Sequence, residues 1–247
     1  MEQHLALPGG ERGTSEVNAV LNTLLRELRQ HAGWENTSGA IAAAEGIAAL
    51  PGEEPVRVLL EVLRNADDVD LTDDAGDLGD EVHRLRAAAH AGLVACGARA
   101  IPLMRPLVRV ELREARHAVM IRALAALGDL SLAPILEAWC ADEVEEQFFC
   151  RLAAIEAVGL LKPPNASSVL RAVLTRPGAL NQGWLKRITA HALGRIGEVD
   201  ALEVLLDDAD WYARLGVAEA LKSLPAERAA RLLARVRVDV DQRVREG

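Results

Sequence analysis

The chain has 247 residues, of which 50% are hydrophobic and 26% are charged, and its formal net charge at pH 7 is -9. A composition this rich in apolar residues excludes a disordered chain and supplies enough material for a buried core. Because aromatic residues make up only 3% of the chain, that core has to be built mainly from Ala, Leu, Val and Ile.

The N-terminal end carries two features. Residues 1–13 include Pro8-Gly9-Gly10 and no apolar run of the kind that signal peptides have, so we expect a flexible tail there. Over residues 14–32, apolar side chains from Val17 to Leu28 follow the i, i+3, i+4, i+7 spacing of an amphipathic helix. A single apolar stripe predicts a helix that caps the structure following it.

From residue 33 onward, one apolar pattern recurs six times. Each copy ends in a hydrophobic residue followed by Gly, Pro or Lys, which we call the boundary residue. The boundary residues are Pro51, Gly97, Gly128, Lys162, Gly197 and Pro225. The residue four positions before each of them is always aliphatic, and the residue five positions before is always Gly or Ala. A shift of register would destroy this agreement, so the segments are copies of one helical unit.

Each copy is followed by a second short apolar segment with helical spacing. These segments cover residues 56–63, 101–108, 132–139, 168–174, 201–206 and 229–236. Pro106 falls inside one of them and should kink or shorten that helix. The first interval between boundary residues is 46 residues, against 28 to 35 for the others, and residues 66–81 account for the excess. With eight acidic residues and two glycines, this segment is predicted to be an acidic insertion loop.

Two segments carry a resemblance to a known family. IRALAALGD (121–129) and AHALGRIGE (190–198) resemble HEAT repeats of the short bacterial kind named after phycobilisome lyases, and the similarity extends over about residues 33–236. It implies an all-α fold: an α-solenoid, wound as a right-handed superhelix, of about six helical hairpins behind an N-terminal capping helix. Residues 14–247 would then form a single repeat domain.

This resemblance implies several functions, because short HEAT repeats occur in scaffolds, chaperone-like adaptors, chromophore lyase subunits and some enzymes. We expect a non-enzymatic scaffold or adaptor that binds a protein partner on the concave face of the solenoid. The alternative is a bilin or chromophore lyase subunit, or a related accessory protein for modification.

The second helices of HEAT arrays usually line the concave side. Charged residues that interrupt the apolar pattern of these helices are therefore candidates for partner binding. We call the following residues the charged strip: Arg57, Arg105, Arg109, Glu137, Arg171, Arg231 and Arg235. Glu61 and Glu203 interrupt the same helices, so the strip predicts recognition of an acidic or mixed surface.

The sequence predicts no catalytic, cofactor-binding or metal-binding residues. Cys96, Cys140 and Cys150 lack paired CxxC spacing and are expected to be buried free thiols in a reducing cytoplasm. A HEAT-like hydroxylase binds iron through His-Glu pairs, and this chain has no such dipeptide. The acidic segment 66–81 lacks the ligand order of an EF-hand. Two interpretations stay open: a solvated loop, or a loop that contacts a cation or a basic partner. There is also no Gly-x-Ser-x-Gly motif and no Gly-rich phosphate loop.

Charge is unevenly distributed along the chain. Residues 82–122 carry eight basic and two acidic side chains, a basic island of net charge +6 in an acidic protein. Nucleic-acid binding needs many cations, so one island does not predict it. The tryptophans at 34, 139, 184 and 211 look scattered and are expected to pack helix ends. We expect a cytoplasmic protein without a membrane span and infer no small-molecule substrate or cofactor.

Overall fold

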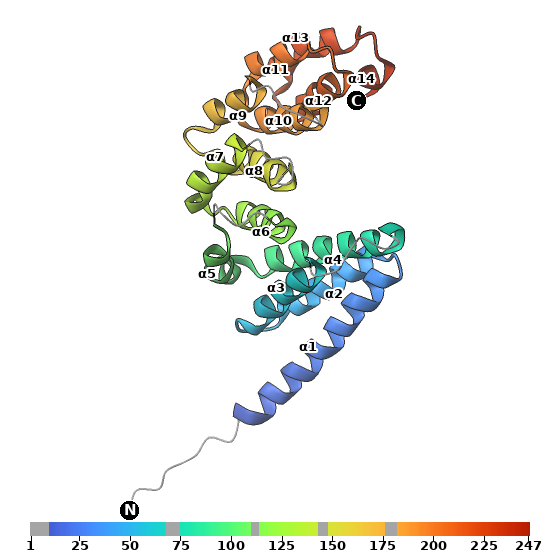
Figure 1. The fold of residues 1–247 in the computed structure, drawn as a ribbon, viewed down its shortest axis with the longest axis vertical. Helices are drawn as coiled ribbons and strands as arrows, with labels where there is room; N and C mark the ends of the chain where they lie inside the picture. Colours follow the sequence, from blue (N-terminus) through green and yellow to red (C-terminus); the bar gives the residue numbers. More distant parts are fainter. Residues whose placement is uncertain (1–9, 68–74, 110–113, 143–147, 176–181) are drawn as a thin grey trace, which may run out of the picture. The chain divides into compact units, whose positions relative to one another are not determined.

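The computed structural model describes residues 10–67, 75–109, 114–142, 148–175 and 182–247, and every regular element among them is helical. The chain divides into two compact units, Met1–Arg105 and Pro106–Gly247. The single repeat domain expected over residues 14–247 stays a prediction, and the two units are described separately below (Figure 1).

The first unit is built around four helices. They are α1 (Gly10–Gly33), α2 (Thr37–Ala49), α3 (Glu54–Asp67) and α4 (Ala75–Ala95), followed by the short elements η1 (Gly97–Ala100), α5 (Ile101–Met104) and η2, which begins at Arg105. Helix α1 packs on α2 and α4, and α4 in turn packs on α2 and α3. Leu28, Ile47, Leu59 and Leu93, one from each main helix, have no exposed surface or almost none.

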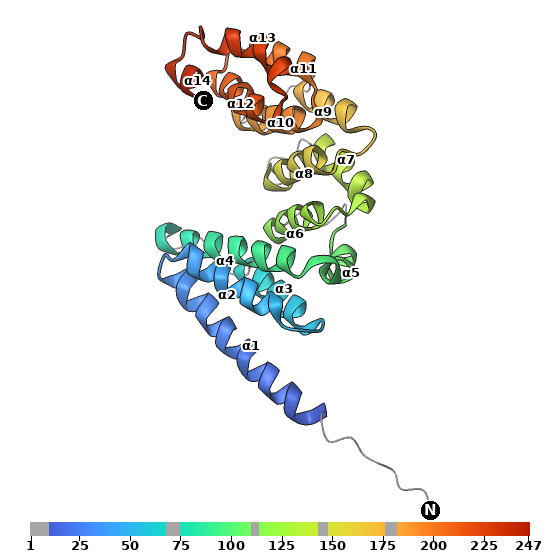
Figure 2. The same cartoon turned by 180° about the vertical axis from the view of Figure 1, so that it is seen from behind.

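The second unit contains two rows of helices. The first row consists of α6 (Ala115–Ala126), α8 (Phe148–Leu161), α10 (Gln182–Ile196) and α12 (Trp211–Ala220); the second row consists of α7 (Ala133–Ala141), α9 (Ala166–Thr175), α11 (Val199–Leu205) and α13 (Ala226–Val236). Each first-row helix packs on the next, from α6 to α12, and α7 contacts α9 as α11 contacts α13. Both views of this unit show the two rows side by side (Figures 1 and 2).

Four of the six boundary residues end the first helix of their repeat in the left-handed backbone conformation. Gly97, Gly128 and Gly197 have φ angles of 64°, 78° and 82°, in the left-handed region that glycine adopts without strain. Lys162 takes the same conformation, with φ 50°. In the first copy the left-handed residue is Gly52 (φ 84°), one position after Pro51. Lys162, which departs from the glycine pattern, therefore still ends its helix in the same way.

Small residues set the distance between first-row helices. A Cβ atom on Gly159 would lie 2.6 Å from the Cα of Ala192, and one on Gly194 would lie 2.9 Å from the carbonyl oxygen of Ala220. Both glycines stand three residues before a boundary residue, and both alanines stand five before the next one. The α8–α10 and α10–α12 interfaces therefore use the same positions of successive copies.

The prediction for Pro106 is confirmed. The helix expected over residues 101–108 ends as α5 after Met104 and continues only as the 3₁₀ turn η2, Arg105–Leu107. Proline lacks the N–H that an α-helix needs and crowds the preceding turn, which accounts for the break. The division between the two units falls at this point of the chain.

Two predicted loop boundaries were wrong. Helix α1 begins at Gly10, so residues 10–13 of the expected tail are helical, while residues 1–9 lie outside the described residues. Helix α3 runs to Asp67 and α4 begins at Ala75, so the acidic loop predicted for 66–81 is helical at both ends. Val82 and Ala88 of α4 are buried. The helix extends from them toward its N-terminus, where acidic residues are tolerated because their negative charge interacts favourably with the helix dipole. Residues 68–74 lie outside the described part.

The short C-terminal helix α14 (Gln242–Glu246) repeats the opening of α12. Asp210 and Asp241 cap these helices, each accepting a hydrogen bond of 2.9 Å from the backbone N–H two residues later. The preceding aspartates do likewise, Asp208 at 2.9 Å and Asp239 at 2.8 Å. The loops that precede α12 and α14 therefore share one capping arrangement.

Within the described residues, no single helix is both long and apolar enough to cross a membrane; the bent pair Asp80–Ala95 and Gly97–Leu107 meets the criterion only jointly.

Candidate binding surface

The charged strip is shared between the two units. Arg57, on α3 of the first unit, is exposed and pairs with Glu53 one helical turn away at 2.9 Å. Arg105 lies in the 3₁₀ turn at the end of the same unit. In the second unit, the exposed Arg109 donates a hydrogen bond to the carbonyl oxygen of Pro106 at 3.4 Å.

The other strip residues of the second unit join neighbouring helices of the second row. Arg171 of α9 pairs with Glu198, the N-cap of α11, at 2.5 Å. Arg231 of α13 pairs with Glu203 of α11 at 2.6 Å. Further links are Glu137 to Asn165 (3.0 Å) and Arg235 to Asp207. These strip residues are therefore already paired with other side chains of the protein, and a partner would have to compete with these pairs.

Part of the basic island serves the fold. Arg99 donates hydrogen bonds to the carbonyl oxygens of Leu50 (2.6 Å) and Gly52 (3.1 Å), just beyond the C-terminal end of α2. Arg122 of α6 pairs with Glu156 of α8 at 2.5 Å. These arginines are occupied by carbonyl and carboxylate groups of the chain itself, so the net charge of +6 overstates the basic surface offered to a partner.

Most of the aromatic residues recur at fixed positions of the repeat, although the four tryptophans looked scattered along the sequence. Five of the seven share two positions of the repeat. Phe149, Trp184 and Tyr212 stand thirteen residues before a boundary residue, and Phe148 and Trp211 stand fourteen before one. The structure places them at the N-terminal ends of three successive first-row helices, α8, α10 and α12.

Three of these residues form one group, which we call the aromatic cluster: Trp184, Trp211 and Tyr212. The ring centroids of Trp184 and Tyr212 are 5.7 Å apart, and those of Trp211 and Tyr212 are 5.1 Å apart. Trp184 is 49% exposed, and Phe149 on the preceding helix is 62% exposed. On a chain so poor in aromatic residues, these exposed rings make this end of the first row a candidate contact surface.

Two arginines contact rings of the aromatic cluster. The guanidinium of Arg187 lies 4.6 Å from the ring centroid of Tyr212 and donates two hydrogen bonds, of 2.7 and 2.6 Å, to Glu219. The guanidinium of Arg243 lies 3.4 Å from the ring centroid of Trp211. These cation–π contacts hold Tyr212 and Trp211 in place, which leaves Trp184 as the accessible ring.

Glu219 is the electrostatic anchor of this arrangement. Burial raises the pKa of the carboxyl group. Hydrogen bonds from Arg187 and His191 lower the pKa by more than burial raises it, so the pKa lies below its usual value. His191 Nε2 is 2.9 Å from the carboxylate. The carboxylate therefore stays ionised at neutral pH and holds Arg187 against the ring of Tyr212.

Asp210 adds a negative charge beside the aromatic cluster. One carboxylate oxygen caps α12 by accepting the Tyr212 N–H, and the other lies against Gly183, where a Cβ atom would displace it. Within the described part of the chain, Asp210 forms no ion pair with a basic side chain. Its charge thus lies beside Gly183, the residue before Trp184 in the sequence.

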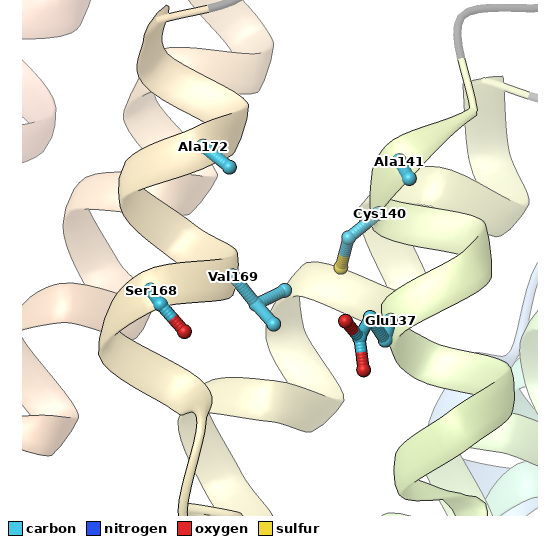
Figure 3. A pocket seen from close by; sticks show the side chains of 6 residues that line it. All are labelled: Glu137, Cys140, Ala141, Ser168, Val169 and Ala172. Atoms are coloured by element: carbon cyan, nitrogen blue, oxygen red, sulfur yellow. The ribbon is translucent and has the colours of Figure 1, made fainter.

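A separate cleft of about 250 Å³ lies between α7 and α9 of the second row. Figure 3 shows Cys140 and Val169 pointing into it from opposite helices, with Glu137 on the same wall as Cys140. Since Glu137 belongs to the charged strip, the strip runs along a surface that is hollowed here. Among the described residues, no group of three or more His, Cys, Asp or Glu side chains is placed to hold a metal ion.

Two patterns of the sequence become visible only when the copies are aligned on their boundary residues. The aromatic positions are one case. A second is the position eleven residues before the boundary residue, which is basic in five copies: Arg86, His117, Arg151, Lys186 and Arg214. The last two pair with Asp208 at 2.6 Å and Asp239 at 2.8 Å, each in the loop that opens the following copy.

Comparison with known proteins gives no relative: the sequence matches no protein-family model, and no curated protein matches it.

Proposed function

We propose that the protein is a non-catalytic interaction scaffold, a HEAT-like α-solenoid that binds a protein partner. The register of its second unit supports the solenoid, because successive first-row helices meet through the same repeat positions, Gly159 against Ala192 and Gly194 against Ala220. A right-handed superhelix of about six hairpins would place equivalent side chains of each copy along one continuous surface.

The observation that carries the binding function is the aromatic cluster with its supporting arginines. Binding energy at protein interfaces concentrates in a few Trp, Tyr and Arg residues set in a rigid surrounding. Trp184 fits this description. It is half exposed and its ring packs against Tyr212, which is held by Arg187 and Glu219. The partner-binding surface of the second unit is therefore centred on this cluster, with the charged strip as a second, polar surface.

The test compares two tryptophans of similar exposure. Trp184→Ala removes the ring of the aromatic cluster, and Trp34→Ala removes an isolated ring, 68% exposed, in the first unit. Proteins captured from the native host by wild type and by each variant are compared by quantitative mass spectrometry. We expect a partner that wild type and Trp34→Ala retain and Trp184→Ala loses, and the loss is then confirmed with the purified partner.

A triple variant, Arg105→Ala with Arg109→Ala and Arg171→Ala, tests the charged strip in the same experiment. If it loses a partner that Trp184→Ala keeps, the strip is the binding surface and the aromatic cluster is not. Identical captured sets for wild type and all variants would remove both surfaces from the proposal.

A further inference from the structure

We infer that the aromatic cluster and Phe149 bind an extended, proline-rich peptide segment that carries an arginine, an inference that rests on the proposed function. Two aromatic platforms are available: Phe149 on α8, and Trp184 with Tyr212 on α10 and α12. Both occupy the same repeat position on helices that pack directly on each other.

The spacing of the platforms selects the conformation of the ligand. Packed helices lie about 8–10 Å apart, so equivalent residues on α8 and α10 are separated by about that distance. A polyproline II helix presents the same face every three residues, about 9.3 Å. A β-strand repeats its face every ~6.6 Å, and an α-helix repeats each turn every ~5.4 Å. Prolines at every third position would therefore match this separation, whereas one strand repeat or one helical turn falls short of it.

Aromatic rings suit such a ligand chemically. Proline-rich segments dock on aromatic side chains, and their preformed conformation keeps the entropy lost on binding small. The platforms are themselves held firmly, because Arg187 lies over Tyr212 and is bound by Glu219 through two hydrogen bonds. Because the peptide and the aromatic rings are both ordered before binding, little conformational entropy is lost when the complex forms.

Charge complementarity specifies the arginine. The carboxylate of Asp210 lies against Gly183, the residue before Trp184, and within the described residues no basic side chain pairs with it. A ligand guanidinium could stack on the open face of Trp184 and pair with Asp210 at once, a combination that arginine makes better than lysine. The net charge of -9 of the whole chain also favours a basic peptide.

The experiment titrates the intact chain with a synthetic peptide that has proline at every third position and one arginine beside the first proline, with calorimetry as the measurement. The matched control peptide has alanine in place of each proline. We expect the proline peptide to bind and the alanine peptide to bind at least about tenfold more weakly. Trp184→Ala and Phe149→Ala should each weaken binding of the proline peptide about tenfold, and Trp34→Ala should leave it unchanged.

Asp210→Asn isolates the charge, since asparagine caps a helix as well as aspartate does. It should lower the affinity for the arginine peptide several-fold and leave the affinity for a glutamine analogue unchanged. Circular dichroism of each variant checks that the helices are intact.

Equal binding of the proline and alanine peptides, no binding at millimolar peptide, or full affinity of Trp184→Ala would overturn the inference. A native partner that needs Trp184 but is not displaced by the proline peptide would also overturn it, and would leave the proposed function standing. If an amphipathic helical peptide displaces that partner instead, the ligand is helical.

Discussion

The two helical rows of the second unit are held together in different ways. First-row helices meet through buried glycine and alanine backbones, as at Gly159 and Ala192. Second-row helices meet through ion pairs at the surface, as between Arg231, 78% exposed, and Glu203. Burial of apolar surface is the dominant stabilising contribution, whereas exposed ion pairs contribute little. The first row therefore fixes the spacing and register of the copies, and the second row can vary its surface chemistry at low cost in stability.

The largest effect should come from truncating the buried row. Leu193 of α10 has no exposed surface, so Leu193→Ala leaves a cavity and should lower the free energy of unfolding by about 2–5 kcal/mol. Leu160→Ala, at a residue of α8 that is 47% exposed, is the control and should cost much less. Urea denaturation of both variants measures the difference, and equal losses would contradict burial of Leu193 as the source of its stabilising effect.

The next effect concerns the shielded ion pair between α12 and the loop that follows α13. Arg214 donates hydrogen bonds of 2.8 and 3.1 Å to Asp239, and their side chains are only 11% and 9% exposed. Asp239→Asn removes the charge and should cost about 1.5–3 kcal/mol at neutral pH, the range for hydrogen bonds to charged groups.

This pair also predicts a pH dependence. The hydrogen bond from Arg214 holds the pKa of Asp239 below its ordinary value. A carboxyl group whose pKa is lower in the folded state stabilises the fold fully above its unfolded pKa, and this contribution is lost as the pH falls through the folded pKa. Urea denaturation at a series of acidic pH values should therefore show a smaller loss of stability in Asp239→Asn than in wild type. Parallel curves would show that the pair is not a source of acid sensitivity.

A somewhat smaller effect is expected at the close contact between first helices. Gly159→Ala places a methyl group 2.6 Å from the Cα of Ala192, and overpacking of this kind costs about 1–3 kcal/mol. The better helix propensity of alanine offsets up to about 1 kcal/mol of that. In Gly33→Ala the new atom meets nothing closer than 4.0 Å, so this control should be neutral or slightly stabilising. Thermal unfolding of the pair decides whether the interface is as tight as the geometry indicates.

The sequence predicted the helical pairs and their ends well because these depend on local signals. Apolar periodicity located the helices, and Gly97, Gly128 and Gly197 located the left-handed turns that end them. The acidic segment before Glu81 was misread because its composition resembles a loop, while its helix is stabilised by continuity with the buried residues of α4. Composition alone does not show which residues a neighbouring helix will order.

The binding surface was harder to predict because it depends on which copies lie side by side. Trp184 and Tyr212 are 28 residues apart in sequence, and only packing of α10 on α12 brings their rings to 5.7 Å. The charged strip shows the same dependence on neighbouring copies. Arg171 and Arg231, predicted to bind a partner, each pair with a glutamate about one repeat away, and their role in binding stays a prediction. Pairing between copies is not visible in any single copy.

The smallest effect should come from the second row. Arg231→Ala breaks an ion pair with Glu203 in which the arginine is 78% exposed, and exposed pairs of this kind are worth about 0.2–1 kcal/mol. A double-mutant cycle with Glu203→Ala, followed by urea denaturation at low and high salt, isolates the coupling, which should fall as salt rises because solvent screens it. Arg235 also reaches Glu203, at 3.7 Å, so some of the interaction should persist in Arg231→Ala alone. A salt-insensitive coupling as large as that of Arg214 and Asp239 would erase the distinction between the rows, since the surface charges would then fix the register as firmly as the buried glycines do.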